Sequence, residues 1–216
     1  MSRTRAVIFD FNGTLSHDEP ILLRIYQELF AAHGRPLTAN DYFSQLAGNT
    51  EEAIIQGWLD VDGNELEALV AERISRYRAA ADGSTVPETI RDAVRFAAAR
   101  GPVAIVSGAF RAEIEPVVAA AELTELFAAV VTANDVVNGK PAPDGYLRAL
   151  SLLGDLPPAE VVAFEDTEAG VASAKAAGLR CIAVLGTFPA ARLAAADEIV
   201  ERIDAALLAR LLDPRP

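Results

Sequence analysis

The chain has 216 residues, of which 51% are hydrophobic and 23% are charged, and its formal net charge at pH 7 is -12. This composition is typical of a globular protein of one or two domains with a full core, and no apolar run approaches the ~18–20 residues needed to cross a bilayer. The acidic balance argues against nucleic-acid binding, which needs a basic surface.

Cysteine usage and the first residues indicate a cytoplasmic protein. The one cysteine, Cys181, cannot form an internal disulfide, and a lone thiol suits a reducing compartment. Its apolar neighbours favour a buried structural thiol over a reactive one. The chain enters an apolar run directly after Arg5, which leaves no room for a signal peptide.

The first predicted element is a buried strand that ends at a carboxylate. The Val-Ile-Phe run at 7–9 is β-branched and aromatic, Gly13 permits a sharp turn, and Thr14 offers a nearby hydroxyl. Ligands bind at the carboxyl ends of strands in an open α/β sheet, so Asp10 could be a nucleophile, a metal ligand or both. The alternative is that Asp10 only caps the turn that follows it.

A block of helices follows before any further strand is predicted. Apolar spacing and end signals predict helices over 18–34, 38–46, 50–59 and 64–81. Helices inserted after a first strand are typical of a separate cap domain. The expected division is therefore a core of residues 1–15 and 87–216 and a helical cap of residues 16–86.

Strands and helices alternate in the rest of the chain. Strands are predicted at 103–107, 128–132, 161–165, 180–185 and around 199–200. Helices are predicted over 87–100, 111–121, 143–153, 167–177, 189–196 and 204–212. This alternation predicts an α/β fold, a doubly wound and mostly parallel sheet with helices on both faces.

Small residues follow the second predicted strand. Ser107 ends this strand, and Gly108 and Ala109 come next. The hydroxyl and the exposed amides after it could hold a phosphate. The alternative is a helix N-cap or a tight turn.

A lysine stands in a stiff segment after the third predicted strand. Only Lys140 and Lys175 among the nineteen basic residues are lysines, and Lys140 lies between Gly139 and Pro141. A rigid backbone favours a positioned ammonium over a solvated surface lysine, which is the alternative.

Two adjacent carboxylates, Glu165 and Asp166, end the fourth predicted strand. Carboxylate oxygens close to another carboxylate are the ligands that Mg²⁺ prefers. The plain alternative is that Asp166 caps the helix that starts at Thr167, which explains one acid better than both.

These four stretches together resemble the motifs of the haloacid dehalogenase superfamily. Asp-Phe-Asn-Gly-Thr at 10–14 is similar to the first motif, Asp-x-Asp-Gly-Thr, and Ser107 matches the second. The segments at 139–146 and 165–170 are similar to the third and fourth motifs. The inserted helical cap is similar to that of the subgroup containing β-phosphoglucomutase and phosphoglycolate phosphatase.

The resemblance implies a Mg²⁺-dependent phosphatase that forms an aspartyl-phosphate on Asp10, with Lys140 neutralising the nucleophile and the phosphoryl oxygens. The implied catalytic residues are Asp10, Asn12, Ser107 and Lys140. The implied phosphate-binding residues are Gly13, Thr14, Ser107, Gly108, Ala109 and Lys140. The implied metal ligands are Asp10, Asn12 through its carbonyl, Glu165 and Asp166.

Position 12 departs from the motif, because Asn12 replaces the aspartate that transfers protons in the family. An amide cannot do this, and loss of a general acid–base group costs about 10²–10⁴ in rate. We expect a slow or atypical phosphatase in which His17, Glu19 or a cap residue supplies the proton. Deamidation of Asn12 to aspartate is another possibility. The alternative function is a catalytically impaired homologue that binds a phosphorylated ligand in a regulatory role.

The cap segment argues against a mutase. Ala47 and Glu51 stand where β-phosphoglucomutase-like caps have a lysine and an arginine for a distal phosphate. A carboxylate would repel that phosphate, which favours hydrolysis of a small phosphate monoester. The expected partner is a small phosphorylated metabolite, with no nucleic acid or membrane, and the chain is expected to be a monomer or weak dimer.

Overall fold

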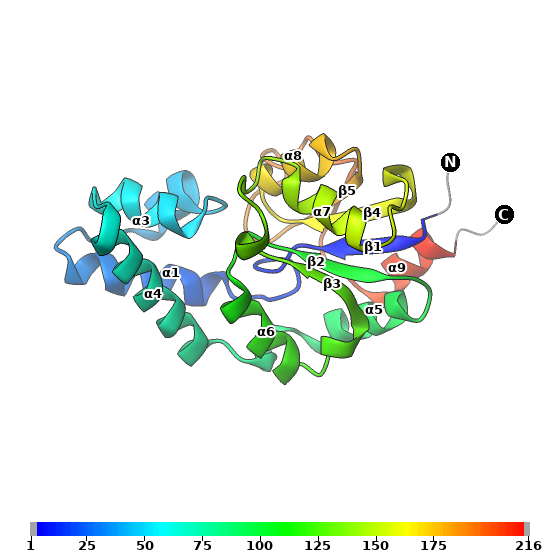
Figure 1. Ribbon diagram of the computed structural model, residues 1–216, viewed down its shortest axis with the longest axis horizontal. Helices are drawn as coiled ribbons and strands as arrows, with labels where there is room; N and C mark the ends of the chain where they lie inside the picture. Colours follow the sequence, from blue (N-terminus) through cyan, green and yellow to red (C-terminus); the bar gives the residue numbers. More distant parts are fainter. Residues whose placement is uncertain (1–3, 214–216) are drawn as a thin grey trace.

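The computed structural model describes residues 4–213 and contains a six-stranded sheet (Figure 1). The strands are β1 (Ala6–Phe9), β2 (Val103–Val106), β3 (Phe127–Val131), β4 (Val161–Glu165), β5 (Arg180–Val184) and β6 (Glu198–Val200). They lie in the order β3-β2-β1-β4-β5-β6, and every neighbouring pair is parallel. The strand order runs outward in both directions from β1, which confirms the predicted doubly wound α/β fold.

Helices cover the sheet and also form a separate group between β1 and β2. This group, the inserted helices, consists of α1 (Glu19–Ala32), α2 (Ala39–Asp41), the π-helical turn η1 (Tyr42–Leu46), α3 (Glu51–Leu59) and α4 (Gly63–Ala80). The remaining helices are α5 (Glu88–Ala98), α6 (Arg111–Ala120), α7 (Asp144–Leu152), α8 (Glu168–Ala176) and α9 (Ala205–Leu212). Short 3-10 turns are η2 (Gly83–Thr85), η3 (Thr124–Leu126), η4 (Ala133–Asp135) and η5 (Pro158–Glu160). Within residues 4–213, no helix is long and apolar enough to cross a membrane.

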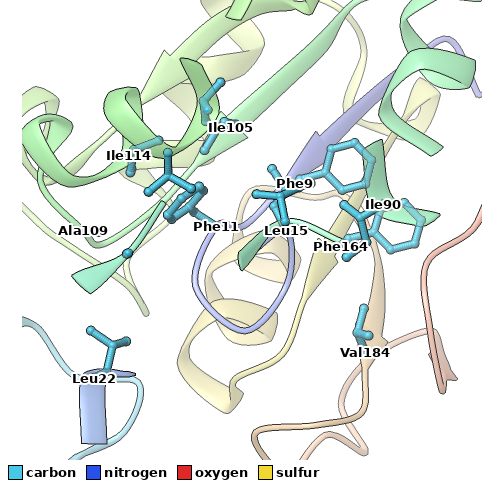
Figure 2. Close-up of a cluster of buried hydrophobic side chains, with 14 of the residues drawn as sticks. Phe9, Phe11, Leu15, Leu22, Ile90, Ile105, Ala109, Ile114, Phe164 and Val184 are labelled. Atoms are coloured by element: carbon cyan, nitrogen blue, oxygen red, sulfur yellow. The ribbon is translucent and has the colours of Figure 1, made fainter. Parts of the chain in front are cut away.

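Alternate residues of the central strands pack into two separate hydrophobic layers. On β1, Val7 and Phe9 belong to the layer that includes residues of α5, α6 and α9. Ala6 and Ile8 belong to the opposite layer, with residues of α7 and α8. Figure 2 shows Phe9 and Phe164 in the first layer, where their rings stack with centroids 5.2 Å apart. Burial of both faces explains why the strands are continuous apolar runs in the sequence.

The inserted helices lie to one side of the sheet, as Figure 1 shows for α1, α3 and α4. Their side chains form a shared apolar interior, in which Tyr26 of α1, Ile55 of α3 and Tyr77 of α4 are each 1% exposed or less. Among the described residues no strand occurs between β1 and β2, as expected from the sequence. The division into a core of residues 1–15 and 87–216 and a cap of residues 16–86 stays a prediction.

Two predicted helices differ from the structure, whereas the other elements agree to within two residues at each end. The segment 189–196 is a series of turns closed by hydrogen bonds between residues three apart, so the predicted helix is wrong. Leu193 is fully buried, and Asp197 exchanges hydrogen bonds with Cys181 in both directions, which holds the segment close to β5 and stops a helix from forming. The helix predicted over 38–46 is α2 continued by the π-helical turn η1.

Candidate active site

Chemically active side chains gather at the carboxyl ends of three neighbouring strands. Asp10 directly follows β1, Ser107 follows β2, and Glu165 and Asp166 stand at the end of β4. Because β2 and β4 flank β1, their parallel arrangement brings these side chains to one edge of the sheet. Asp10, Ser107 and Asp166 line one pocket, whose other end is formed by the inserted helices.

Lys140 joins two of these carboxylates. Its Nζ lies 2.5 Å from Asp10 Oδ1 and 2.6 Å from Glu165 Oε1, and its side chain is 13% exposed. The Tyr146 hydroxyl also donates to Glu165 Oε1, over 2.6 Å. Burial lowers the pKa of the ammonium, but the charges of Asp10 and Glu165 outweigh this effect and raise the pKa of Lys140 above its ordinary value. Lys140 is therefore a fixed positive charge beside Asp10.

Asp10, Glu165 and Asp166 form an acidic cluster, in which one oxygen of each lies within 4.8 Å of the others. Burial, followed by repulsion from Asp10 and Glu165, raises the pKa of Asp166 well above its ordinary value. Among the described residues, Asp166 Oδ1 is buried without a hydrogen-bond partner, whereas Oδ2 accepts a bond from the Thr187 hydroxyl. A buried, uncompensated carboxylate oxygen beside two other carboxylates fits a hard divalent cation such as Mg²⁺.

Position 13 accepts only glycine without a rearrangement of the site. Its φ is +71°, and a Cβ would overlap the Asp166 carboxylate and lie 2.6 Å from Thr187 Oγ1. The turn after β1 thus passes directly against the acidic cluster. Neither Gly13 nor Thr14 is among the residues that line the pocket, and the Thr14 hydroxyl is buried without a partner in the described part of the chain. Their predicted phosphate-binding roles stay predictions.

Ser107, Gly108 and Ala109 line the same pocket as Asp10 and Asp166. The Ser107 hydroxyl oxygen accepts the Ala109 amide over 3.1 Å, which is the tight turn that the sequence left open as an alternative. This bond uses a lone pair of Ser107, so its O–H remains able to donate to an anion. The arrangement is compatible both with a purely structural turn and with a hydroxyl that binds phosphate, and the phosphate-binding role stays a prediction.

Asn12 lines the same pocket, and its side chain is held from behind by a buried carboxylate. Asn12 Nδ2 donates to Asp18 Oδ2 over 2.9 Å, and the Tyr77 hydroxyl donates to the same oxygen. Asp18 is fully buried, and this burial raises its pKa to about 6, against the lowering effect of its hydrogen bonds with Tyr77, Ser16 and Asn12. The amide at position 12 is therefore the partner of an acid at position 18.

The inserted helices supply a polar end to the pocket. Arg73 of α4 is 1% exposed, and its guanidinium lies 3.3 Å from Glu51 of α3 and pairs with Glu113 of α6. Tyr42 donates to Glu19 of α1 over 3.1 Å. Both Glu51 and Glu113 have raised pKa values because they are buried, although the charge of Arg73 lowers them.

Sequence analysis singled out Glu19 and Glu51 at this site but missed Asp18 and Arg73. A buried arginine inside a helix carries no local sequence signal, because its partner Glu113 lies forty positions further along the chain. His17, a predicted proton source, is exposed and is not among the residues that line the pocket.

The fold and the strand-end carboxylates are those of an α/β enzyme that binds its ligand at the carboxyl edge of the sheet. A family model described as a haloacid dehalogenase-like hydrolase matches residues 4–178. The chain belongs to this family, as its motifs predicted.

Two curated relatives and one crystal structure agree with this assignment. Protein CbbY of Rhodobacter capsulatus is 34% identical over 191 residues, which cover 82% of this chain and 84% of that protein. Validoxylamine A 7'-phosphate phosphatase of Streptomyces hygroscopicus subsp. limoneus is 30% identical over 200 residues, 91% of this chain and 93% of that protein. The crystal structure of CbbY from Rhodobacter sphaeroides in complex with phosphate matches with a TM-score of 0.83 and 27% identity, over 96% of this chain and 99% of that one. The predicted enzyme class, a phosphatase of this family, is confirmed, and the substrate is left open.

Proposed function

We propose that the protein is a Mg²⁺-dependent hydrolase of small phosphate monoesters that works through an aspartyl-phosphate on Asp10. The observation that carries this proposal is the position of the Asp10 carboxylate, 2.5 Å from the Lys140 ammonium and within the acidic cluster at the floor of the pocket. A carboxylate that faces a pocket beside a fixed cation can attack an anionic phosphorus atom, because the cation offsets their mutual repulsion.

The residues of this chain have separate parts in the proposed reaction. Asp10 forms a bond to phosphorus while the ester oxygen leaves, and water then releases phosphate from Asp10. Lys140 places a positive charge 2.5 Å from Asp10 and offsets the charge of the phosphoryl oxygens. Asp10, the Asn12 carbonyl, Glu165 and Asp166 would hold Mg²⁺. When bound, this ion neutralises the clustered carboxylates and the phosphoryl group.

In the proposed reaction the Ser107 turn helps to bind the phosphoryl group. Ser107, Gly108 and Ala109 line the pocket together with Asp10 and Asp166. Gly13, which is not part of the pocket lining, lets the backbone of the first motif pass close to Asp166. If the chain divides into a core and a cap as the sequence predicts, the inserted helices form the cap and enclose the leaving group.

A small phosphorylated metabolite is the proposed substrate. One relative is named for a phosphate ester, validoxylamine A 7'-phosphate, and the structure of CbbY holds phosphate. Glu19 and Glu51, which line the pocket from the inserted helices, disfavour a second phosphate, and Arg73 is already paired with two carboxylates. The expected cytoplasmic location and the monomer or weak dimer stay predictions.

The second candidate is a catalytically impaired homologue that binds a phosphorylated ligand in a regulatory role. The observation that favours it is the Asn12 side chain, an amide whose nitrogen is already engaged with Asp18 and which cannot carry a proton. We expect turnover to be slow for the same reason.

Hydrolysis of p-nitrophenyl phosphate separates the two candidates. Its leaving group needs little protonation, so the proposed enzyme turns it over when Mg²⁺ is added and loses this activity in the Asp10→Asn variant. The variant keeps the size of the side chain and removes the nucleophile. If wild-type protein binds phosphate with Mg²⁺ present but hydrolyses no ester, the binding protein is the better account.

A further inference from the structure

The pocket contains a carboxylate that the family motifs do not use. Glu19, the first residue of α1, lines the pocket together with Asp10 and Asn12. We propose that Glu19 takes over the proton transfers that the aspartate of the first motif performs elsewhere in the family. This inference rests on the proposed function and assigns the missing acid–base group.

Among the acidic groups of the pocket, Glu19 differs in its partners. Asp10 is within 2.5 Å of Lys140, and Glu51 is within 3.3 Å of Arg73. Asp166 belongs to the acidic cluster that fits a metal ion. Within residues 4–213 Glu19 forms no ion pair, and its polar contact is the hydrogen bond donated by the Tyr42 hydroxyl.

Other candidate proton donors are disfavoured by their positions or by their weak acidity. His17 is exposed and lies outside the pocket lining. Asp18 is fully buried behind Asn12 and is also absent from the lining. Tyr42 also lines the pocket, but its hydroxyl already donates to Glu19, and burial raises its pKa well above the ordinary value, which makes it a weak general acid. Glu19 is the acid that remains.

The pKa of Glu19 depends on charged groups of both the core and the inserted helices. Burial, followed by repulsion from Asp18, raises its pKa to about 7, and the Tyr42 hydrogen bond opposes this rise. The charges of Asp10 at the core end and Arg73 on the inserted helices act on it as well, in opposite directions. A carboxyl group with this pKa can donate and accept a proton near neutral pH, as an acid–base catalyst must.

The position of Glu19 suits the ester oxygen of the substrate. With phosphorus beside Asp10 and Lys140, the leaving group would occupy the remainder of the same pocket, which Glu19 lines at the start of α1. In the first step the Asp10 oxygen bonds to phosphorus, the phosphorus–oxygen ester bond breaks, and the departing oxygen takes the proton of Glu19. In the second step water attacks phosphorus and gives a proton to the Glu19 carboxylate, and the bond to Asp10 breaks. Each cycle restores both side chains.

A pair of substrates that differ in the leaving group tests this role. We would measure kcat/KM for p-nitrophenyl phosphate and p-nitrobenzyl phosphate, which have similar sizes but an acidic phenol and a weakly acidic alcohol as products. This parameter covers the steps through ester cleavage. In Glu19→Gln the ratio of the phenyl to the benzyl value is expected to rise about 10²–10⁴-fold, because only the alcohol needs a proton to leave.

Glu51→Gln is the matched control, since it makes the same change at another carboxylate that lines the pocket and is expected to leave the ratio as in wild type. Glu19→Asp keeps an acid one methylene further back and is expected to give an intermediate ratio. An unchanged ratio in Glu19→Gln, or an equal rise in Glu51→Gln, overturns the role of Glu19 while Asp10-dependent turnover still supports the phosphatase. Absence of wild-type turnover of both esters overturns the proposed function and this inference with it.

Discussion

Restoring the aspartate of the family motif at position 12 is expected to damage this protein. Asn12 Nδ2 donates to Asp18 Oδ2 over 2.9 Å, so Asn12→Asp replaces a hydrogen bond by two facing carboxylates. At this separation and an effective dielectric constant of about 20, the repulsion is at most about 6 kcal/mol. A shared proton relieves part of it, so we expect the free energy of unfolding to fall by about 2–4 kcal/mol at pH 8 and by less at pH 5.

Urea denaturation at the two pH values, in the presence of a chelator, measures this loss. The double variant Asn12→Asp, Asp18→Asn restores an amide–carboxylate pair with its members exchanged, and it should recover most of the stability that the single variant loses. The double variant, rather than Asn12→Asp alone, should also show the faster turnover of an alkyl phosphate. The reasoning is refuted if Asn12→Asp is as stable as wild type at pH 8, or if the second substitution recovers nothing.

Three further predictions follow from the same contacts. Burial raises the pKa of Asp18 from 3.8 to about 6, so the stability that its protonated form contributes is complete below pH ~4 and is lost as the pH rises through ~6. The stability difference between wild type and Asp18→Asn should therefore change by about 3 kcal/mol between pH 4 and pH 8. A constant difference in urea denaturation contradicts this. Gly13→Ala should lower both the melting temperature and the Mg²⁺ affinity, because its Cβ would overlap the Asp166 carboxylate. Gly34→Ala is the control: its φ is +72° and nothing lies within 4 Å of its Cβ, so it should show only backbone strain of about 1–2 kcal/mol. Equal effects of the two substitutions would contradict a clash at position 13. Lys140→Met leaves the acidic cluster without its cation and should lower kcat/KM for p-nitrophenyl phosphate by about 10²–10³, and a loss below tenfold would exclude a charge-stabilising role.

The parts of the site that follow from local sequence could be predicted. Asp10, Ser107 and Glu165 each end an apolar strand, and parallel strands bring such ends to one edge of a sheet. Their positions at the ends of parallel strands were therefore enough to predict that they lie at one edge of the sheet. Lys140 was recognised from its stiff surroundings and its rarity, and its ammonium lies 2.5 Å from the Asp10 carboxylate.

The contacts of the inserted helices could not be predicted from the sequence. The hydrogen bond between Asn12 and Asp18 depends on the path of the chain between β1 and the start of α1. The pairing of Arg73 with Glu113 depends on how α4 packs on α6. Helix packing brings together residues that are distant in sequence, and no local pattern records it. The helix expected over 189–196 was wrong for a related reason, since the buried Leu193 and tertiary hydrogen bonds override the local helix propensity.

The most direct test of this account is detection of a phosphoryl group on Asp10. Wild-type protein mixed with p-nitrophenyl phosphate and Mg²⁺, quenched rapidly in acid and digested, should give a phosphorylated peptide that contains Asp10, and Asp10→Asn should not. Borohydride trapping, which converts an acyl phosphate to an alcohol, would locate the modified residue. Mg²⁺-dependent turnover without a phosphoryl group at Asp10, or with the group on another residue, would contradict the central claim that Asp10 is the nucleophile.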